Sequence, residues 1–486
     1  MFGNRARDIR LTTGICILTA VCLSGCAATT QAPGEHPPLT NRQRDAALKA
    51  LLGPQQFGEY VLISDTIQAT EWLRRFWAAH DPTPTTPENE FRDEHERRVY
   101  HAIYLFGTHL KGGPPWDDRG EVYIRYGQPD ERVVHQPEEG DDDLSNAPPS
   151  VGSGNDPLRS PLNKRGAATE IWVYYRWNET FQFEDKRGFG YYELAPVTDP
   201  SYQRQGTTAF QTTRLRAIDL QPAIYYHEYG KNLIDYALDV VRFRGPEGQW
   251  HIDINLGYPL SQVGRGIDSV SISLRRTIVV RDEKQDEVFS EVGLINRQVG
   301  KIGTKNQLMI EQKSLDLKPG HYTVAVTIDD LATGKTGTYL KDLRLPEYVV
   351  REVQEISDIE VASFVWSIYE PGSPFVKAGQ MVTPLPSRVY LKDQSLAFYF
   401  EVYHLLLDDA GKTHYKIEYD ITQIGGDKHL SRSEPGEFSG ASREIDHAAT
   451  LDIADLPSGD YVLTVRVTDI VGKHEKSTVA RFSKSN

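Results

Sequence analysis

A tryptophan, two acids and an arginine stand together as Trp116, Asp117, Asp118, Arg119 and Gly120. Two carboxylates and a guanidinium beside an aromatic ring could grip a sugar or a peptide. Two carboxylates about 5–9 Å apart could also hydrolyse a glycosidic bond. In the structural alternative, Gly120 frees the backbone at a strand entry, Asp118 caps the loop or pairs with Arg119, and Trp116 covers the sheet edge. We expect the structural role.

A second polar group, Glu88, Asn89 and Glu90, stands in the first turn of a helix predicted over 87–106. Further along this helix, acids and histidines fall on one face and could be imagined around a metal. The segment 95–99, HERRV, lacks the second histidine of the zinc motif HExxH. Ion pairs on a solvated face are the simpler interpretation, so no metal site is assigned.

Other chemical signatures are missing from the sequence. It contains no GxSxG, no phosphate-binding loop and no GxGxxG after a strand. Asp130 belongs to a Gly-Gln-Pro-Asp turn, and Asp141–Asp143 lack the spacing of a calcium loop. We therefore assign no catalytic residue and no cofactor, although dispersed Ser, His and Asp side chains could still meet in space. A protein that is not an enzyme is the favoured expectation.

The first 26 residues have the pattern of a lipoprotein signal peptide. Three arginines precede the short apolar stretch 11–25, which is shorter than the roughly 20 residues needed to span a bilayer. The stretch ends in Leu23-Ser24-Gly25-Cys26, which resembles a bacterial lipobox. This resemblance implies that Cys26 is acylated and holds the chain at a membrane. Ala27, which is not Asp, favours the outer membrane by bacterial sorting rules.

Composition narrows the class of protein. The net charge is −14, and no basic stripe is present, which argues against nucleic-acid binding. The three cysteines all lie within residues 1–26, so the rest of the chain has no disulfide and no thiolate metal site. Its length of 486 residues suggests about three or four domains.

The spacing of apolar residues and the positions of Gly and Pro predict an α+β region over 40–221, preceded by a Pro-rich tether at 27–39. Residues 137–167 are rich in Pro, Gly, Ser and Asp and are predicted to be a mobile insertion. The predicted elements are helices at 41–52, 64–80 and 87–106, the last capped by Thr86, and strands at 121–126, 170–177, 180–185 and 188–194 in an antiparallel meander.

The second half of the chain has an all-β pattern and an internal repeat. Residues 314–337 and 451–477 share the core L-x-x-G-x-Y-x-x-x-V-x-x-x-D. Two such copies indicate two sandwich modules, each near its last strands. Hairpins are predicted at 234–259 and 394–422, the latter turning at Asp408–Gly411.

Four stretches in the first half of the sequence resemble the GWxTD-domain family of bacterial lipoproteins and secreted proteins. They are FWAAHDPTPTTPENEFRDEHERRV (76–99), WDDRGEVYIRYGQPDE (116–131), EIWVYY (170–175) and GFGYYEL (188–194). The family's Gly-Trp-x-Thr-Asp-Arg-Gly is replaced here by Pro114-Pro115-Trp116-Asp117-Asp118-Arg119-Gly120, with the tryptophan one position late. The resemblance implies a fold and a location and supplies no reaction.

Together these observations predict an α+β N-terminal domain followed by two immunoglobulin-like sandwiches. The expected boundaries are 1–26 signal peptide, 27–39 tether, 40–221 α+β domain, 222–350 first sandwich and 351–486 second sandwich. The expected function is binding or assembly at the outer membrane, with an envelope protein as partner. The alternative is a carbohydrate-binding or glycan-hydrolysing enzyme that uses the acids around Trp116–Arg119.

Overall fold

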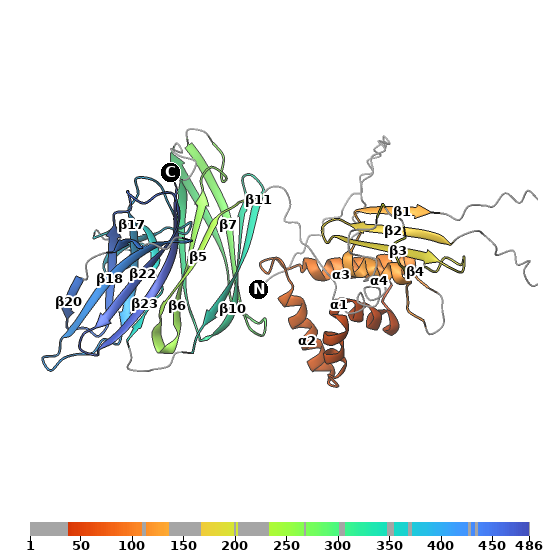
Figure 1. Cartoon of the computed structure of the whole chain (residues 1–486), viewed down its shortest axis with the longest axis horizontal. Helices are drawn as coiled ribbons and strands as arrows, with labels where there is room; N and C mark the ends of the chain where they lie inside the picture. Colours follow the sequence, from red (N-terminus) through yellow and green to blue (C-terminus); the bar gives the residue numbers. More distant parts are fainter. Residues whose placement is uncertain are drawn as a thin grey trace, which may run out of the picture.

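The computed structural model describes residues 37–108, 113–135, 167–198, 201–202, 233–266, 269–300, 307–347, 354–367, 372–425, 429–432 and 436–485. The predicted signal peptide, Cys26 and almost all of the predicted insertion at 137–167 lie outside these residues. So do the predicted borders at 221/222 and 350/351. An α+β domain, a first sandwich and a second sandwich follow one another along the long axis of the molecule (Figure 1). No helix among the described residues is long and apolar enough to cross a bilayer.

Among the described residues, four α-helices form one part of the α+β domain. They are α1 (Asn41–Val61), α2 (Thr66–Ala79), α3 (Glu90–Phe106) and α4 (Asp118–Tyr126). The predicted stop at Gly53 is a kink, where φ is +70° and the chain then resumes a helical path to Val61. Helix α3 begins three residues later than predicted. Its N-cap is Asn89, whose side chain accepts from the Arg92 amide at 2.9 Å, and not Thr86.

The predicted strand 121–126 is wrong, because these residues belong to α4. The Asp117 side chain caps this helix by accepting from the Arg119 amide, and Gly127 ends it with φ of +81°. Val122, Tyr123, Ile124, Arg125 and Tyr126 are all buried. Val122, Ile124 and Tyr126 alternate with Tyr123 and Arg125 in the sequence, so this short stretch fits the two-residue period of a strand as well as the period of a helix.

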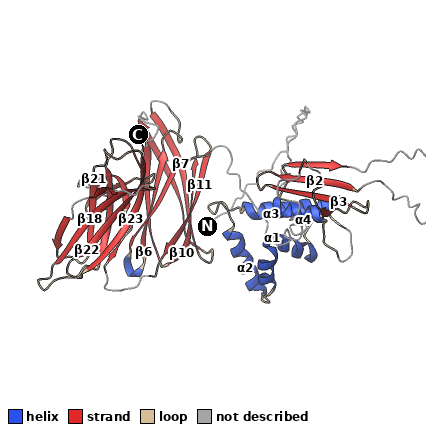
Figure 2. Ribbon diagram, in the orientation of Figure 1, coloured by secondary structure: helices blue, strands red, loops and turns tan. Residues whose placement is uncertain are grey.

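An antiparallel sheet covers α3 and α4 (Figure 2). The predicted meander is present, although its last strand is shorter than expected and a strand at 131–135 precedes it. The order is β1 (Glu131–His135), β2 (Ala168–Tyr174), β3 (Glu179–Asp185) and β4 (Glu193–Ala195). Aromatic rings from both layers, Phe106, Tyr123, Trp172 and Phe183 among them, fill the space between helices and sheet.

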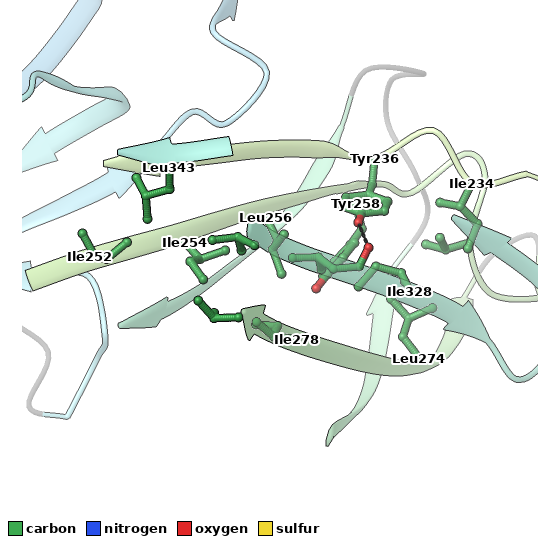
Figure 3. Packing of buried hydrophobic residues seen from close by; sticks show 14 of the residues in the cluster. Ile234, Tyr236, Ile252, Ile254, Leu256, Tyr258, Leu274, Ile278, Ile328 and Leu343 are labelled. Carbon is green, nitrogen blue, oxygen red and sulfur yellow. Dashed lines mark hydrogen bonds between the residues drawn. The ribbon is translucent and has the colours of Figure 1, made fainter. Parts of the chain in front are cut away.

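Two antiparallel sheets packed face to face make the first sandwich. One has the order β5-β6-β9 and the other β11-β10-β7-β8. Isoleucine, leucine, valine and tyrosine side chains from both sheets meet in one core (Figure 3). The strands are β5 (Ala237–Arg244), β6 (Trp250–Pro259), β7 (Ser269–Asp282), β8 (Glu287–Gly300), β9 (Leu308–Leu317), β10 (Gly320–Asp330) and β11 (Lys335–Leu345). The hairpin predicted at 234–259 is confirmed, with a 3₁₀ turn at Pro246–Gly248.

The second sandwich also has two sheets. The first contains β12 (Glu355–Ile356), β13 (Glu360–Trp366), β14 (Val376–Lys377), β15 (Gln380–Pro384), β17 (Leu396–Tyr403) and β21 (Ile445–Leu451). The second contains β16 (Val389–Tyr390), β18 (Thr413–Gln423), β19 (His429–Arg432), β20 (Gly436–Gly440), β22 (Gly459–Asp469) and β23 (His474–Lys484).

The hairpin predicted at 394–422 is wrong. The chain does turn at Asp408–Gly411, but β17 and β18 belong to different sheets. Strand β17 pairs with β13 and β21, while β18 pairs with β22. The turn therefore crosses from one sheet to the other, which lets both strands bury their apolar faces in the same core.

The internal repeat is confirmed as two matching hairpins. Strands β10 and β11 pair from Gly320↔Leu345 to Asp330↔Lys335, and β22 and β23 pair from Gly459↔Lys484 to Asp469↔His474. In each hairpin the tyrosine hydroxyl donates to the carbonyl oxygen four residues earlier. Tyr322 donates to Lys318 at 2.9 Å, and Tyr461 donates to Pro457 at 2.6 Å.

Candidate functional site

The Trp116–Gly120 motif forms a buried ion network. Arg119 donates to Asp117 at 2.7 Å and to Glu170 on β2 at 2.9 Å. Its guanidinium carbon lies 3.7 Å from the centre of the Tyr192 ring. Trp116 is only 1% exposed and donates through Nε1 to Glu121 at 3.1 Å. Trp116 is therefore buried inside the domain, and the cap and the ion pair with Arg119, both expected of Asp118, are made by Asp117.

The acids of this motif are fully engaged. Asp117 accepts from the amides of Arg119 and Tyr192, and Asp118 accepts from the Leu194 amide at 2.7 Å. Burial raises the pKa of Asp117. Burial alone would also raise the pKa of Glu170, but hydrogen bonds from Arg132 and Trp172 and the charge of Arg119 lower it. These contacts join α4 to the sheet.

The strand entry predicted for Gly120 is instead a helix start, and its lack of a side chain serves close packing. A Cβ at Gly120 would lie within 2.6–2.8 Å of the Trp116 side chain. Asp130, the last residue of the predicted turn, accepts from the Tyr175 amide at 2.7 Å. Both residues therefore shape the backbone around the motif and add no chemical group to a cleft.

Glu88, Asn89 and Glu90 lie elsewhere, in the segment 81–90 that leads into α3. Asn89 caps the helix and also donates to the Trp77 carbonyl at 2.7 Å. Glu90 accepts from the Thr83 hydroxyl. Glu88 and Asn89 line a groove between the α+β domain and the first sandwich. The Trp116–Gly120 motif and these three residues therefore lie in different parts of the α+β domain.

Segment 81–90 is docked on the outer face of the sheet β11-β10-β7-β8. Arg281 on β7 donates to the Ala78 carbonyl at 3.0 Å and to Asp81 at 3.2 Å. Arg74 on α2 donates to Asp286 and to the carbonyl of Gln285. The hydroxyls of Thr85 and Thr327 share a hydrogen bond. These contacts fix the width of the space that remains between the two domains.

That space, here called the interdomain groove, has two lobes on either side of Thr86 and Pro87, which line both. The threonine lobe is an open hollow of about 570 Å³. The tryptophan lobe encloses about 410 Å³ and is lined by Trp77, Glu88, Asn89 and Arg92 together with Thr70, Leu73, Arg74, Ala78, Asp81 and Arg281. Grooves at domain interfaces are common ligand sites.

Two neighbouring cross-strand rows make the floor of the threonine lobe. Pairing places Val292, Thr277, Thr327 and Thr338 side by side across four strands. In the next row, Leu294, Arg275, Asp329 and Thr336 are aligned in the same way. Alternate residues of a strand share a face, so both rows point outward. The roof is Thr83, Thr85, Thr86 and Pro87.

A second polar cluster lies where the two sandwiches meet. Lys377 of β14 pairs with Asp253 of β6 and with Glu360 of β13, and its Nζ lies 4.0 Å from the centre of the Phe243 ring. Although burial alone would lower it, the charges of Glu360 and Asp253 raise the pKa of Lys377. A small pocket of about 210 Å³ opens beside it.

His251 lines this pocket but is not available as a general base. Its Nδ1 lies 2.7 Å from Asp316, and its Nε2 lies 3.4 Å from Asp253. These hydrogen bonds raise the pKa of His251 to about 9, so the ring is a cation at neutral pH. Because Lys377 and His251 both pair with Asp253, we interpret the cluster as a charged joint between modules.

Sequence reasoning missed both the threonine floor and the Lys377 cluster. Their residues lie far apart in the chain, and isolated threonines or lysines in strands carry no pattern that indicates a site. Within the part of the chain that the structure describes, no three His, Cys, Asp or Glu side chains are placed to hold a metal ion.

A scan against protein-family models and a search of curated proteins each found no match to this chain. The resemblance to the GWxTD-domain family therefore stays a prediction, based on the strings in which it was found.

Proposed function

We propose that this protein is a lipid-anchored component of a bacterial envelope that binds a ligand or partner in the interdomain groove without catalysing a reaction. The interdomain groove is the observation that carries the proposal. It is wide, it is lined by polar side chains, and ion pairs between two domains hold its walls. Cys26 would carry the lipid and place the groove beside the outer membrane.

The geometry of the Trp116–Arg119 motif also supports a role without catalysis. General acid–base catalysis by two carboxylates needs groups that can reach a substrate. Asp117 is 2% exposed, and Asp118 accepts a backbone hydrogen bond. The hydrolase alternative would require both acids to leave these partners.

The two sandwiches would act as immunoglobulin-like spacer or docking modules. The paired tyrosine hydrogen bonds support this finer assignment, because a strand tyrosine bonded to the backbone just upstream is a mark of such domains. The interface between the modules is apolar at Val241, Phe243 and Ala362 and charged around Lys377. It would keep them as one rigid spacer.

Membrane fractionation tests the anchor. We expect Cys26→Ser protein to leave the membrane pellet, because the hydroxyl cannot replace the thiol that takes the lipid. Cys22→Ser, in the same apolar stretch, is the matched control and should stay with the membrane. A Cys26→Ser protein that still sediments with the bilayer would contradict the proposal.

Co-purification from detergent-solubilised envelopes tests the binding role. A stoichiometric partner or ligand should be recovered with the wild-type protein and lost with Thr277→Arg, which fills the threonine lobe. Thr464→Arg, on β22 of the second sandwich, should leave recovery unchanged. Repeated recovery of the wild-type protein alone would count against binding.

A further inference from the structure

We infer that the ligand of the interdomain groove is a neutral oligosaccharide that spans both lobes. The inference rests on the proposed binding function and names the ligand class of that same groove. It is drawn from the kind of hydrogen-bonding groups in the walls, from their charge balance, and from the shape of the space.

Threonine is the commonest residue in the threonine lobe, and it presents both hydroxyl and methyl groups. Seven of its eleven lining residues are threonine. A threonine hydroxyl offers one donor and two acceptor lone pairs, as a sugar hydroxyl does, so each can meet the other in either role. The threonine methyl groups, Val292 and Pro87 give apolar contact for the C–H faces of a sugar ring. Such a wall suits a ligand that alternates hydroxyl and C–H groups.

The hydroxyls of the floor keep capacity for a ligand. Thr327 bonds to Thr85 and to Thr338, and Thr336 donates to Asp329, so these side chains are held in place. Thr277 lies between Val292 and Thr327 in the same row, and its hydroxyl makes no hydrogen bond within the described residues. Ordered hydroxyls with unused lone pairs bind at a small cost in side-chain entropy.

The charges of the walls argue against an anionic ligand. Each arginine that lines the groove is paired with a carboxylate. Arg275 pairs with Asp329, Arg281 with Asp81, Arg92 with Glu96, and Arg74 with Glu71 and Asp286. An anionic ligand would have to displace a carboxylate to gain a cation, whereas sugar hydroxyls can share these ion pairs without breaking them.

The tryptophan lobe adds the complementary groups. Trp77 is half-buried there, with its ring also packed on Phe76 and Phe91, and the carboxylate of Glu88 is exposed beside it. The Glu88 carboxylate can accept hydrogen bonds from sugar hydroxyls next to the remaining exposed surface of Trp77. Since the two lobes share Thr86 and Pro87, a linear chain of several sugars fits the space better than a single ring.

A peptide strand fits the same floor less well. The floor is the face of a sheet, and the backbone groups of β7 and β10 are already paired with strands on both sides. An added strand needs a free sheet edge to use its main-chain hydrogen bonds. The floor therefore offers a peptide only side-chain contacts, most of them from threonine.

Calorimetric titration of the full mature chain with neutral linear tetrasaccharides tests the inference. Cellotetraose, maltotetraose and chitotetraose are the probes, and an alginate tetrasaccharide is the anionic comparison. We expect at least one neutral probe to bind. Its Kd should rise about 3- to 10-fold in Thr277→Val, which loses one hydroxyl, and similarly in Glu88→Ala in the other lobe. Thr464→Val and Glu437→Ala, both on the second sandwich, are the matched controls.

Several outcomes would overturn the inference: no binding of any neutral tetrasaccharide, tighter binding of the alginate probe, or equal Kd values for wild type and both groove variants. A rise in Kd for only one of the two variants, Thr277→Val or Glu88→Ala, would contradict a ligand that spans both lobes of the groove. These failures are separable from failure of the proposed function. Membrane anchoring through Cys26 and co-purification of another partner do not depend on sugar binding.

Discussion

Arg281 and Asp81 form an ion pair across the boundary between the first sandwich and the α+β domain. The distance from Nη2 to Oδ2 is 3.2 Å, and the side chains are 15% and 4% exposed. Burial raises the pKa of Asp81, and the charge of Arg281 opposes that rise. The carboxylate therefore depends on a residue 200 positions away for its charge partner.

We predict that Arg281→Met loosens the α+β domain from the sandwich. Removing one partner leaves a buried charge, which costs about 3–5 kcal/mol when the pair is fully buried and somewhat less here. In a double-mutant cycle with Asp81→Asn, the coupling energy should be about 1–3 kcal/mol. Urea unfolding followed by tryptophan fluorescence measures it, because Trp72, Trp77, Trp116, Trp172 and Trp177 all lie in the α+β domain.

The exposed pair Arg275–Asp329 is the matched control, since it lies on the same sheet with side chains 50% and 26% exposed. Its coupling energy should stay below about 1 kcal/mol. Equal coupling in the two pairs would show that Arg281 does not hold the domains together.

A second prediction concerns the Trp116–Gly120 motif. Arg119→Met should destabilise the α+β domain by about 3–5 kcal/mol, because Asp117 and Glu170 would both lose their shared cation in a buried site. Arg92→Met, which breaks the exposed pair with Glu96, should cost less than about 1 kcal/mol. Urea midpoints by tryptophan fluorescence separate the two. A wild-type midpoint for Arg119→Met would refute the structural role.

The sequence predicted the elements that have local signals. The spacing of apolar residues predicts the helices over 64–80 and 87–106, although the cap of the second is Asn89 and not Thr86, and the repeat predicts both late hairpins. The sequence does not predict helix α4, because Val122, Ile124 and Tyr126 alternate like strand residues and a helix of 9 residues is too short for its own period to stand out. The sheet-crossing turn at Asp408–Gly411 was also missed, since turn residues do not reveal which sheet receives the next strand.

The candidate site was less accessible to sequence reasoning. Glu88 and Asn89 were singled out and do line the interdomain groove, but for their place in a motif and not for the groove itself. Its floor depends on the register of four strands, and Thr85 meets Thr327 across 242 residues of chain. Such a surface is a product of tertiary packing, which no local pattern of threonines specifies.

A third prediction is a pH dependence at the joint between the sandwiches. The pKa of His251 is raised to about 9, first by its hydrogen bond with Asp253 and then by Asp316, while Lys377 faces the same Asp253. A raised folded-state pKa stabilises the protein below the unfolded value near 6.5, and this contribution is lost as pH rises through about 9. His251→Gln should therefore have a lower melting temperature than wild type at pH 6.

The difference between His251→Gln and wild type should shrink as the pH approaches 10, and thermal melts from pH 6 to pH 10 would show this. The pKa of Asp253 is shifted in the opposite direction. Despite its burial, the hydrogen bond from His251 and the charge of Lys377 lower the pKa of Asp253 to about 2, so its contribution is lost only as the pH falls through about 2. A gap between the two proteins that is constant up to pH 10 would exclude His251 as the titrating group.

The last prediction compares the two copies of the repeat. Tyr322→Phe and Tyr461→Phe each remove one hydroxyl that donates to a backbone carbonyl four residues earlier. Each change should cost about 0.5–1.5 kcal/mol, because a neutral hydrogen bond is lost and the ring stays packed. The tyrosines lie in different sandwiches and share no partner, so their costs should add within about 0.5 kcal/mol in the double variant.

Tyr339→Phe, whose exposed hydroxyl donates to Asp235, is the control and should cost less than either. Denaturant unfolding followed by far-ultraviolet circular dichroism reports both sandwiches. A clear loss of unfolding free energy for one variant with none for the other would show that the repeated tyrosine does not stabilise both modules in the same way.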